Sequence, residues 1–354
     1  MVFNHAPFDL EGRRVLLLAE GEFSPLGAKT AVCYLRYRGN DVVAVLDSTH
    51  SGRTTADVVG IGGSTPIVAN IEESLAFSPE VAIIGVAPRG GRIDPGLRRT
   101  IEACFGAGMD VVSGLHTLIR DDPSLCAAAA DTGARFWDVR FVPAVGTVAS
   151  GAGCTTGAKT VLLTGTDCNV GKMTATVELY DEAVRRGLNA SWAATGQTGI
   201  MLRGRGVCID RVIADFIGGA AEELVNFEGK GKDLVFVEGQ GSLQHPGYAG
   251  VTLGLMFGVM PDRMVIAHHL GRDRIRRYEV PIPPIGEVVR LHEEVMAPLK
   301  HVPVVAIALN TAEHDLAAAK RAAADLARET GLPVADPVRF GVSEILDAVT
   351  AGLL

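Results

Sequence analysis

Residues 165–174 carry the residue types that bind phosphate groups, at a spacing close to that of known phosphate-binding loops. Glycines let the backbone curl so that several N–H groups point at one phosphate, a lysine neutralises the outer phosphate, and a hydroxyl binds the phosphate or its metal ion. We therefore expect a phosphorylated cofactor here, bound by Gly165, Thr166, Asp167, Asn169, Val170, Gly171, Lys172, Met173 and Thr174.

The spacing departs from the standard Walker A pattern in two places. Five residues separate Gly165 from Gly171, and Met173 stands between Lys172 and Thr174. The alternative is a turn and helix start that bind nothing. An apolar strand before the loop and a helix after it favour the phosphate site, because the helix N-terminus adds positive potential.

An acidic residue ends a second apolar run, Leu234–Val237, and glycines follow it. Ligands of open α/β sheets bind at the carboxyl ends of the strands. Glu238 is therefore expected to face the phosphates and, if Mg²⁺ is used, to hold it together with Thr174. The alternative is a solvated loop carboxylate. Asn310 ends the run Val304–Leu309 and is expected either to contact the cofactor or to cap a helix.

Several further side chains stand where a substrate or a base could bind. Arg89 and Arg92 lie in a glycine-rich turn after an apolar run and could hold carboxylates in bidentate fashion. His116 could lie on the same rim. For all three the alternative is a solvated surface position. His245, seven residues beyond Glu238, is the candidate base because histidine titrates near neutral pH, and Glu238 is the alternate.

Two other groups of basic residues, His268–His269 and Arg272–Arg277, each have two alternative interpretations. His268 and His269 follow an apolar run, but paired histidines suggest a metal only with carboxylate or cysteine partners. The run Arg272–Arg277 is typical of a solvated helix face, with a role on a cofactor phosphate as the alternative.

Apolar runs that alternate with helical patterns must position these residues. Runs of this kind without polar alternation indicate parallel sheets covered on both faces. The expected strands are Val15–Ala19, Val42–Leu46, Pro66–Val68, Val81–Val86, Asp110–Ser113, Thr160–Thr164, Ala190–Ala194, Leu234–Val237, Arg263–Ala267, Val304–Ala308 and Pro333–Ala335. The expected helices include Ala28–Tyr37, Leu97–Ala107 and Ala317–Glu329.

A segment rich in Gly, Ser and Thr, Val145–Lys159, divides these elements as a linker would. The fold class is therefore α/β. Residues 1–145 are expected to form a Rossmann-like parallel-sheet domain, and residues 146–354 a P-loop NTPase-like α/β domain.

Composition narrows the function classes. The chain of 354 residues carries a net charge of −8, which argues against a nucleic-acid partner. The 6 cysteines form no CxxC pair, so neither a disulfide framework nor a zinc site is expected. The sequence shows no secretory signal and no long apolar stretch, so a cytoplasmic protein without a membrane partner is expected. A homo-oligomer is compatible with the sequence, which does not decide the oligomeric state.

The loop Gly-Thr-Asp-x-x-Val-Gly-Lys-x-Thr resembles the variant P-loop of dethiobiotin synthetase and the cobyrinic acid amide synthetase group. Dethiobiotin synthetase has a catalytic lysine after its second strand. Here that region reads Ser-Trp-Ala-Ala-Thr-Gly-Gln-Thr-Gly, without lysine. The resemblance implies a nucleotide pocket and leaves the carboxylate-phosphorylating chemistry in doubt.

Over its full length the chain resembles a bacterial family formerly of unknown function that includes D-glutamate N-acetyltransferase. The matching segments are Ala28–Thr30, Gly85–Ile93, Val111–His116, the phosphate loop and Glu238–Pro246. The resemblance implies an N-acetyltransferase that uses acetyl-CoA on the amine of an acidic amino acid, D-glutamate. Two alternatives stay open: an ATP- and Mg²⁺-dependent ligase or kinase, and a non-catalytic nucleotide-binding regulator.

Overall fold

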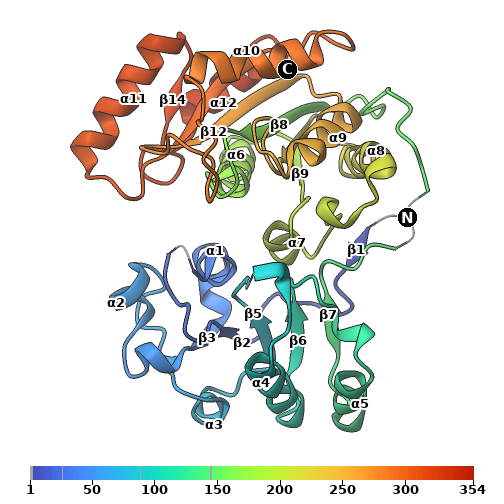
Figure 1. Cartoon of the computed structure of the whole chain (residues 1–354), viewed down its shortest axis with the longest axis vertical. Helices are drawn as coiled ribbons and strands as arrows, with labels where there is room; N and C mark the ends of the chain where they lie inside the picture. Colours follow the sequence, from blue (N-terminus) through green and yellow to red (C-terminus); the bar gives the residue numbers. More distant parts are fainter. Residues whose placement is uncertain (1–2, 26, 88, 144–145) are drawn as a thin grey trace. The chain divides into compact units, whose positions relative to one another are not determined.

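The computed structural model describes residues 3–25, 27–87, 89–143 and 146–354, and the side chain of Arg89 is outside the described part. The chain forms two compact units, each built around a six-stranded parallel sheet (Figure 1). The first comprises Asn4–Phe141 and Ile200–Arg205, and the second comprises Val142–Gly199 and Gly206–Leu354 together with the first residues of the chain. The expected α/β class, Rossmann-like and then P-loop-like, is confirmed.

The N-terminal unit has the strand order β4-β3-β2-β5-β6-β7, the arrangement of a Rossmann sheet. The strands are β2 (Val15–Leu18), β3 (Val42–Leu46), β4 (Ile67–Val68), β5 (Val81–Ile84), β6 (Asp110–Ser113) and β7 (Phe136–Asp138). The helices are α1 (Lys29–Arg38), α2 (Thr55–Val59), α3 (Ile71–Ser74), α4 (Pro95–Gly106) and α5 (Pro123–Thr132). A short pair, β1 (Asn4–His5) and β10 (Arg205–Gly206), lies outside this sheet.

The C-terminal unit has the strand order β14-β13-β12-β8-β11-β9. The strands are β8 (Lys159–Gly165), β9 (Ala190–Ala193), β11 (Leu234–Glu238), β12 (Arg263–His269), β13 (Val304–Asn310) and β14 (Val334–Ala335). The helices are α6 (Lys172–Arg185), α8 (Ile217–Glu228), α9 (Ala249–Val259), α10 (Ile285–Met296), α11 (Leu316–Thr330) and α12 (Ser343–Thr350). Helix α7 (Gln197–Arg203) begins in this unit, and its residues from Ile200 onward belong to the N-terminal unit. Because β8 lies between β12 and β11, the loops that follow these three strands meet at one edge of the sheet.

Alternating side chains of these strands build the core of the C-terminal unit. Leu162 of β8, Val235 of β11 and Ile266 of β12 are fully buried against α8, α9 and α10. Helix α6 contacts β8, β9 and β11 and packs against α12. Every expected strand is present, with ends shifted by a residue or two, whereas β7 and α5 of the N-terminal unit were not predicted.

The segment that composition marks as a linker is held firmly where it is described. Its expected boundary residue, Val145, is outside the described residues. Beyond it, Ser150 donates its backbone N–H to Glu222, and Asn226 accepts the backbone N–H of Thr155 at 2.8 Å. Both acceptors belong to α8. Side chains of α8 therefore satisfy backbone groups of residues 150–155, and the domain boundary near Val145–Lys159 stays a prediction.

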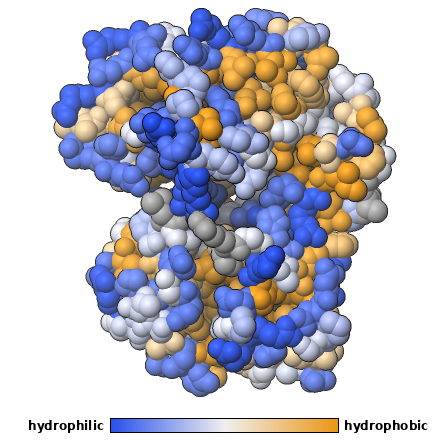
Figure 2. All heavy atoms as spheres, viewed as in Figure 1, coloured by the Kyte–Doolittle hydropathy of each residue, from blue (hydrophilic) through white to orange (hydrophobic). Residues whose placement is uncertain are grey.

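Hydrophilic side chains cover much of the face of each unit that is visible in Figure 2, with apolar side chains between them. Among the described residues there is no helix with both the length and the apolar character needed to span a bilayer.

Candidate active site

The phosphate loop joins β8 to α6 at the centre of the sheet edge. Gly165 ends β8, and a Cβ at this position would lie 2.8 Å from the carbonyl oxygen of Ala267, so only glycine fits between β8 and β12. Asn169 and Gly171 take positive φ angles of 54° and 107°. These left-handed positions, which glycine and asparagine tolerate best, curl the backbone into the start of α6.

The N-terminus of α6 is suited to an anion. Its N-cap is Gly171, and no side chain caps it. The first-turn N–H groups and the helix dipole are therefore directed at the space above the loop. Val170 and Met173 are buried beneath the loop, whereas Thr174 is half-buried in the first turn of the helix.

Lys172 ties this loop to the loop after β11. Its Nζ donates to the carbonyl oxygen of Asp167 at 2.7 Å and to that of Gly241 at 2.8 Å. The side chain is buried, with 8% of its surface exposed. Two backbone carbonyl groups thus hold the ammonium beside the uncapped N-terminus of α6, where it could bind the phosphate of a ligand.

Asp167 anchors a basic loop against the phosphate loop. Its fully buried carboxylate accepts the backbone N–H of Cys168 at 2.6 Å and that of Arg276 at 2.7 Å, and pairs with Arg272 at 3.2 Å. The same guanidinium donates to the carbonyl oxygen of Cys168. Residues 272–277 form a turn between β12 and α10, so the prediction of a helix face is wrong here. The turn at residues 272–277 packs on the phosphate loop because the buried Asp167 carboxylate accepts hydrogen bonds from Arg272 and Arg276 of that turn.

Asn310 lies at the end of β13 beside the phosphate loop. A Cβ on Gly171 would be 3.9 Å from its Nδ2. Its Oδ1 accepts the backbone N–H of Ala312 at 3.1 Å, and Asp315 is the N-cap of α11. The helix-cap alternative is therefore wrong for Asn310, and contact with a cofactor stays a prediction.

Glu238 ends β11 and is held by the loop after β9. Its Oε2 accepts the backbone N–H of Thr195 at 3.0 Å and that of Gly196 at 3.1 Å, and Gln240 donates to its Oε1 at 3.2 Å. A Cβ on Gly199 would lie 2.3 Å from Oε2. The buried carboxylate therefore fixes the β9–α7 connection. Binding of Mg²⁺ by Glu238 and Thr174 stays a prediction.

His245 lies in the loop after β11 with 3% of its surface exposed. Burial lowers the pKa of the imidazole, nearby Lys172 lowers it further, and Asp167 opposes them. The backbone N–H of Gly247 donates to Nδ1 at 3.1 Å. In the neutral ring the proton is therefore on Nε2, which makes Nε2 a donor. The rings of Tyr248 and Tyr278 pack against the imidazole at centroid distances of 4.3 and 5.0 Å.

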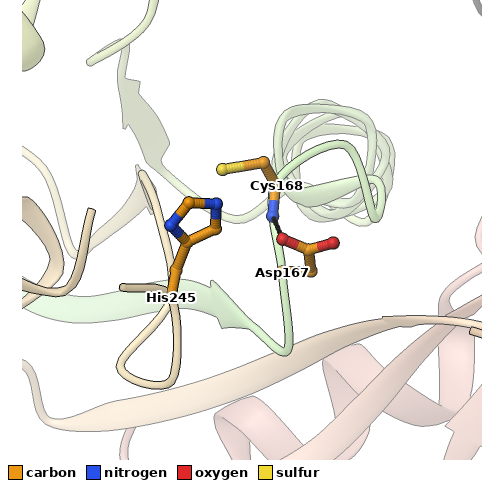
Figure 3. A group of neighbouring side chains, drawn as sticks. All are labelled: Asp167, Cys168 and His245. Carbon is orange, nitrogen blue, oxygen red and sulfur yellow. Dashed lines mark hydrogen bonds between the residues drawn. The ribbon is translucent and has the colours of Figure 1, made fainter. Parts of the chain in front are cut away.

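Asp167, Cys168 and His245 form a compact group at the mouth of the phosphate loop (Figure 3). One carboxylate oxygen, Sγ and one ring nitrogen all lie within 4.8 Å of one another. In Figure 3 one ring nitrogen of His245 is turned toward Cys168 and the other away from it. Sequence reasoning gave Cys168 no role. A signal was present, because Cys168 lies within the phosphate loop and a thiolate is a strong nucleophile.

The paired histidines His268 and His269 end β12, where His268 is half-buried and His269 is buried. His268 contacts Thr166 through Nδ1 and Oγ1 at 3.0 Å, and burial, His269 and Arg272 lower its pKa to about 4. Burial lowers the pKa of His269 as well, and its Nδ1 donates to the carbonyl oxygen of Leu270. Both rings are therefore neutral at pH 7 and serve as hydrogen-bonding groups of the loop.

The remaining candidates belong to the N-terminal unit. Arg92 and His116 are exposed at the carboxyl edge of its sheet. A Cβ on Gly91 would come within 2.6 Å of the His116 ring, so the turn and His116 are close neighbours there. The side chain of Arg89 and the whole of Pro88 lie outside the described residues. Substrate binding by Arg89, Arg92 and His116 stays a prediction.

Comparisons with known proteins agree with this architecture. A family model described as "Domain of unknown function (DUF1611_C) P-loop domain" matches residues 147–346. A second, described as "Domain of unknown function (DUF1611_N) Rossmann-like domain", matches residues 48–141. The chain belongs to the DUF1611 family.

Family members with curated names carry an activity. A "D-glutamate N-acetyltransferase" of Tritonibacter scottomollicae is 36% identical over 287 residues, which cover 79% of this chain and 84% of the relative. Another of the same name from Pseudoalteromonas sp is 35% identical over 78% of this chain and 83% of its own length. The crystal structure of a DUF1611 family protein from Anabaena variabilis is 42% identical, with a TM-score of 0.91 over 96% of this chain and 99% of that one.

The family relationship confirms the resemblance expected from the sequence. The chain is accordingly an enzyme, an N-acetyltransferase. This finding favours the acetyltransferase interpretation over the ligase and over the non-catalytic regulator.

Proposed function

We propose that this protein transfers the acetyl group of acetyl-CoA to the amine of an acidic amino acid, D-glutamate. The observation that carries the proposal is the relationship to two proteins called D-glutamate N-acetyltransferase, each sharing more than a third of its residues over most of both chains. The acceptor and the acetyl donor are the parts that need a test, because related enzymes can differ in either.

The C-terminal unit offers a site that suits the phosphates of CoA. CoA carries a diphosphate and a 3′-phosphate, and both need cations and N–H donors. The uncapped N-terminus of α6 and the Lys172 ammonium supply these at the loop. Arg276 and Arg277 lie on the adjoining turn, which Asp167 holds in place. These groups support the binding of a phosphorylated ligand, for which we propose acetyl-CoA.

The acceptor must attack the thioester carbonyl as a neutral amine, and negative charge then develops on the carbonyl oxygen. A general base needs a lone pair on the nitrogen that faces the substrate. In His245 the lone pair is on Nδ1, where it accepts the backbone N–H of Gly247, and the other nitrogen, Nε2, carries the proton. We therefore assign to His245 an Nε2–H that donates to the developing oxyanion. The departing CoA thiolate, itself a base, takes a proton from the attacking amine.

Polar atoms in the same loop are available to an acceptor. Ser242 Oγ and both amide atoms of Gln244 are buried and have no hydrogen-bond partner among the described residues. Buried polar groups without partners are uncommon in folded proteins and call for a water or a ligand. These atoms suit the carboxylates and the amine of an amino acid.

The test uses purified protein with acetyl-CoA and either D-glutamate, L-glutamate or D-aspartate, followed by mass spectrometry of the N-acetylated product and of released CoA. We expect N-acetyl-D-glutamate, formed at the same rate with and without EDTA. Lys172→Ala is the control with weakened cofactor binding, and it should form the product more slowly at a limiting acetyl-CoA concentration. ATP turnover that depends on an amino acid, without release of CoA, would establish the ligase instead.

A further inference from the structure

Cys168 is a nucleophilic side chain in the candidate site. It has no role if the acceptor amine attacks acetyl-CoA directly. It lies in the phosphate loop three residues before the N-cap of α6. The residue is half-buried, so a ligand bound at the loop can reach it. Its Sγ lies within 4.8 Å of a ring nitrogen of His245, a residue more than seventy positions away in the chain. Two separate loops therefore converge on this sulfur.

The surroundings of Cys168 favour the thiolate, the reactive form of cysteine. The Nε2–H of His245 is turned toward it, as Figure 3 shows. Lys172 and Arg272 donate to the carbonyl oxygens of Asp167 and Cys168, so two cations flank the backbone that carries the thiol. The dipole of α6 adds positive potential. The Asp167 carboxylate opposes the thiolate, but it is paired with Arg272 and binds two backbone N–H groups.

A bound metal ion is a weaker explanation for the same three side chains. Both oxygens of Asp167 already accept hydrogen bonds, and a cation would have to displace the donors. The Lys172 ammonium and the Arg272 guanidinium are within the same loop and would repel a divalent ion.

We propose that Cys168 is a catalytic nucleophile that carries the acetyl group as a thioester between donor and acceptor. This inference rests on the proposed acetyl transfer from acetyl-CoA. In the first step the Cys168 thiolate attacks the acetyl carbonyl, an S–C bond to the enzyme forms, the S–C bond to CoA breaks, and CoA leaves as a thiolate. The two thioesters are chemically equivalent, so the step requires no further energy source.

In the second step the neutral amine of the acceptor attacks the acetyl-cysteine. The new N–C bond forms, the Cys168 S–C bond breaks, and the sulfur returns to its thiolate. The acceptor ammonium gives up two protons overall, one to the CoA thiolate and one to solvent. His245 Nε2–H stabilises the thiolate in the free enzyme and the oxyanion in both steps, which accounts for its position beside Cys168.

The experiment mixes the full-length protein with acetyl-CoA in the absence of an acceptor, quenches with acid, and measures the intact mass. We expect the wild-type protein to gain one acetyl group, mapped by peptide sequencing to Cys168. Labelled CoA should exchange into acetyl-CoA under the same conditions. Initial rates with varied acetyl-CoA and D-glutamate should give parallel double-reciprocal lines, the mark of a covalent intermediate.

Cys168→Ala and Cys168→Ser should lose the acetyl adduct and the exchange, and their kcat/KM for acetyl transfer should fall by roughly three orders of magnitude. Cys126→Ala, which changes another half-buried cysteine in the N-terminal unit, is the matched control and should behave as wild type. Melting temperatures show whether the Cys168 variants fold. If they do not fold, the presence or absence of an acetyl group on Cys168 of the wild-type protein still tests the covalent intermediate.

Two results separate this inference from the proposed function. If the wild-type protein acetylates D-glutamate without an adduct and with intersecting lines, direct transfer occurs and the Cys168 role is wrong. If it forms the adduct and exchanges CoA but acetylates no amino acid, the proposed acceptor is wrong and the Cys168 role stands.

Discussion

Lys172 of the phosphate loop and Gly241 of the loop after β11 are joined by a hydrogen bond of 2.8 Å from Nζ to a backbone carbonyl oxygen. This bond links the residue expected to bind phosphate to the loop that carries His245 four residues later. Cofactor binding at Lys172 and the position of His245 are therefore coupled through a single stretch of backbone.

Lys172→Ala should weaken acetyl-CoA binding by roughly tenfold to a hundredfold, because it removes a charge-assisted hydrogen bond to the phosphates. The fold should persist, since the ammonium donates to the backbone carbonyl groups of Asp167 and Gly241, which belong to loops rather than to strands or helices. Isothermal titration with acetyl-CoA and with ATP measures the effect, and Lys159→Ala at the start of β8 serves as the control. Equal affinity of the Lys172 variant and wild type for both ligands would remove the loop from the site.

His245→Gln should retain much more activity than His245→Ala. Glutamine keeps an N–H donor near the position of Nε2 but cannot take a proton at neutral pH, so the pair separates donation from base catalysis. If His245→Gln is as inactive as His245→Ala, hydrogen-bond donation is not sufficient, and His245 acts as the general base instead.

Asp167→Asn should destabilise the protein by roughly 2–4 kcal/mol and reduce cofactor binding, because the buried carboxylate holds Arg272 and two backbone N–H groups. Arg274→Ala is the matched control, since its partner Glu279 is almost fully exposed. Its effect should stay within about 0.5 kcal/mol. Urea unfolding of both variants gives the comparison, and similar losses would mean that Asp167 does not organise the basic loop.

Two histidines with lowered pKa values, the half-buried His268 and the fully buried His292, predict a loss of stability in acid. Burial lowers the pKa values of His268 and His292 to about 4, from the usual histidine value of 6.5. The unfolded chain therefore binds these protons first, so their contribution to stability is complete above pH 6.5 and decreases as pH falls toward 4. The decrease should be on the order of 2–3 kcal/mol for a fully buried ring.

The double variant Thr164→Val/His292→Leu tests this linkage. His292 donates from Nδ1 to Val288 and accepts from the Thr164 hydroxyl at Nε2, so the two substitutions remove the titrating group and its partner together. Melting temperatures measured from pH 7 to pH 4 should fall less steeply than in wild type. An unchanged slope would exclude His292 as a source of the acid sensitivity.

The sequence alone determined the two α/β units and the location of the phosphate loop. Continuous apolar runs such as Val304–Leu309 can be satisfied only by strands covered on both faces, and glycines 165 and 171 mark where the backbone must curl. These features depend on neighbours in the chain. The family resemblance rested on the same local motifs, and the comparisons confirmed it.

Only the tertiary structure decided what the individual site residues contact. Glu238 and the Thr195–Gly196 backbone are separated by more than forty residues, and no local pattern shows that they bind each other. The same holds for Asp167 with Arg272, and for Cys168 with His245. In a parallel sheet, the loops that follow the carboxyl ends of the strands all lie at one edge. Which side chains meet there depends on the order of the strands in the sheet. The spacing of apolar residues along the sequence does not encode that order.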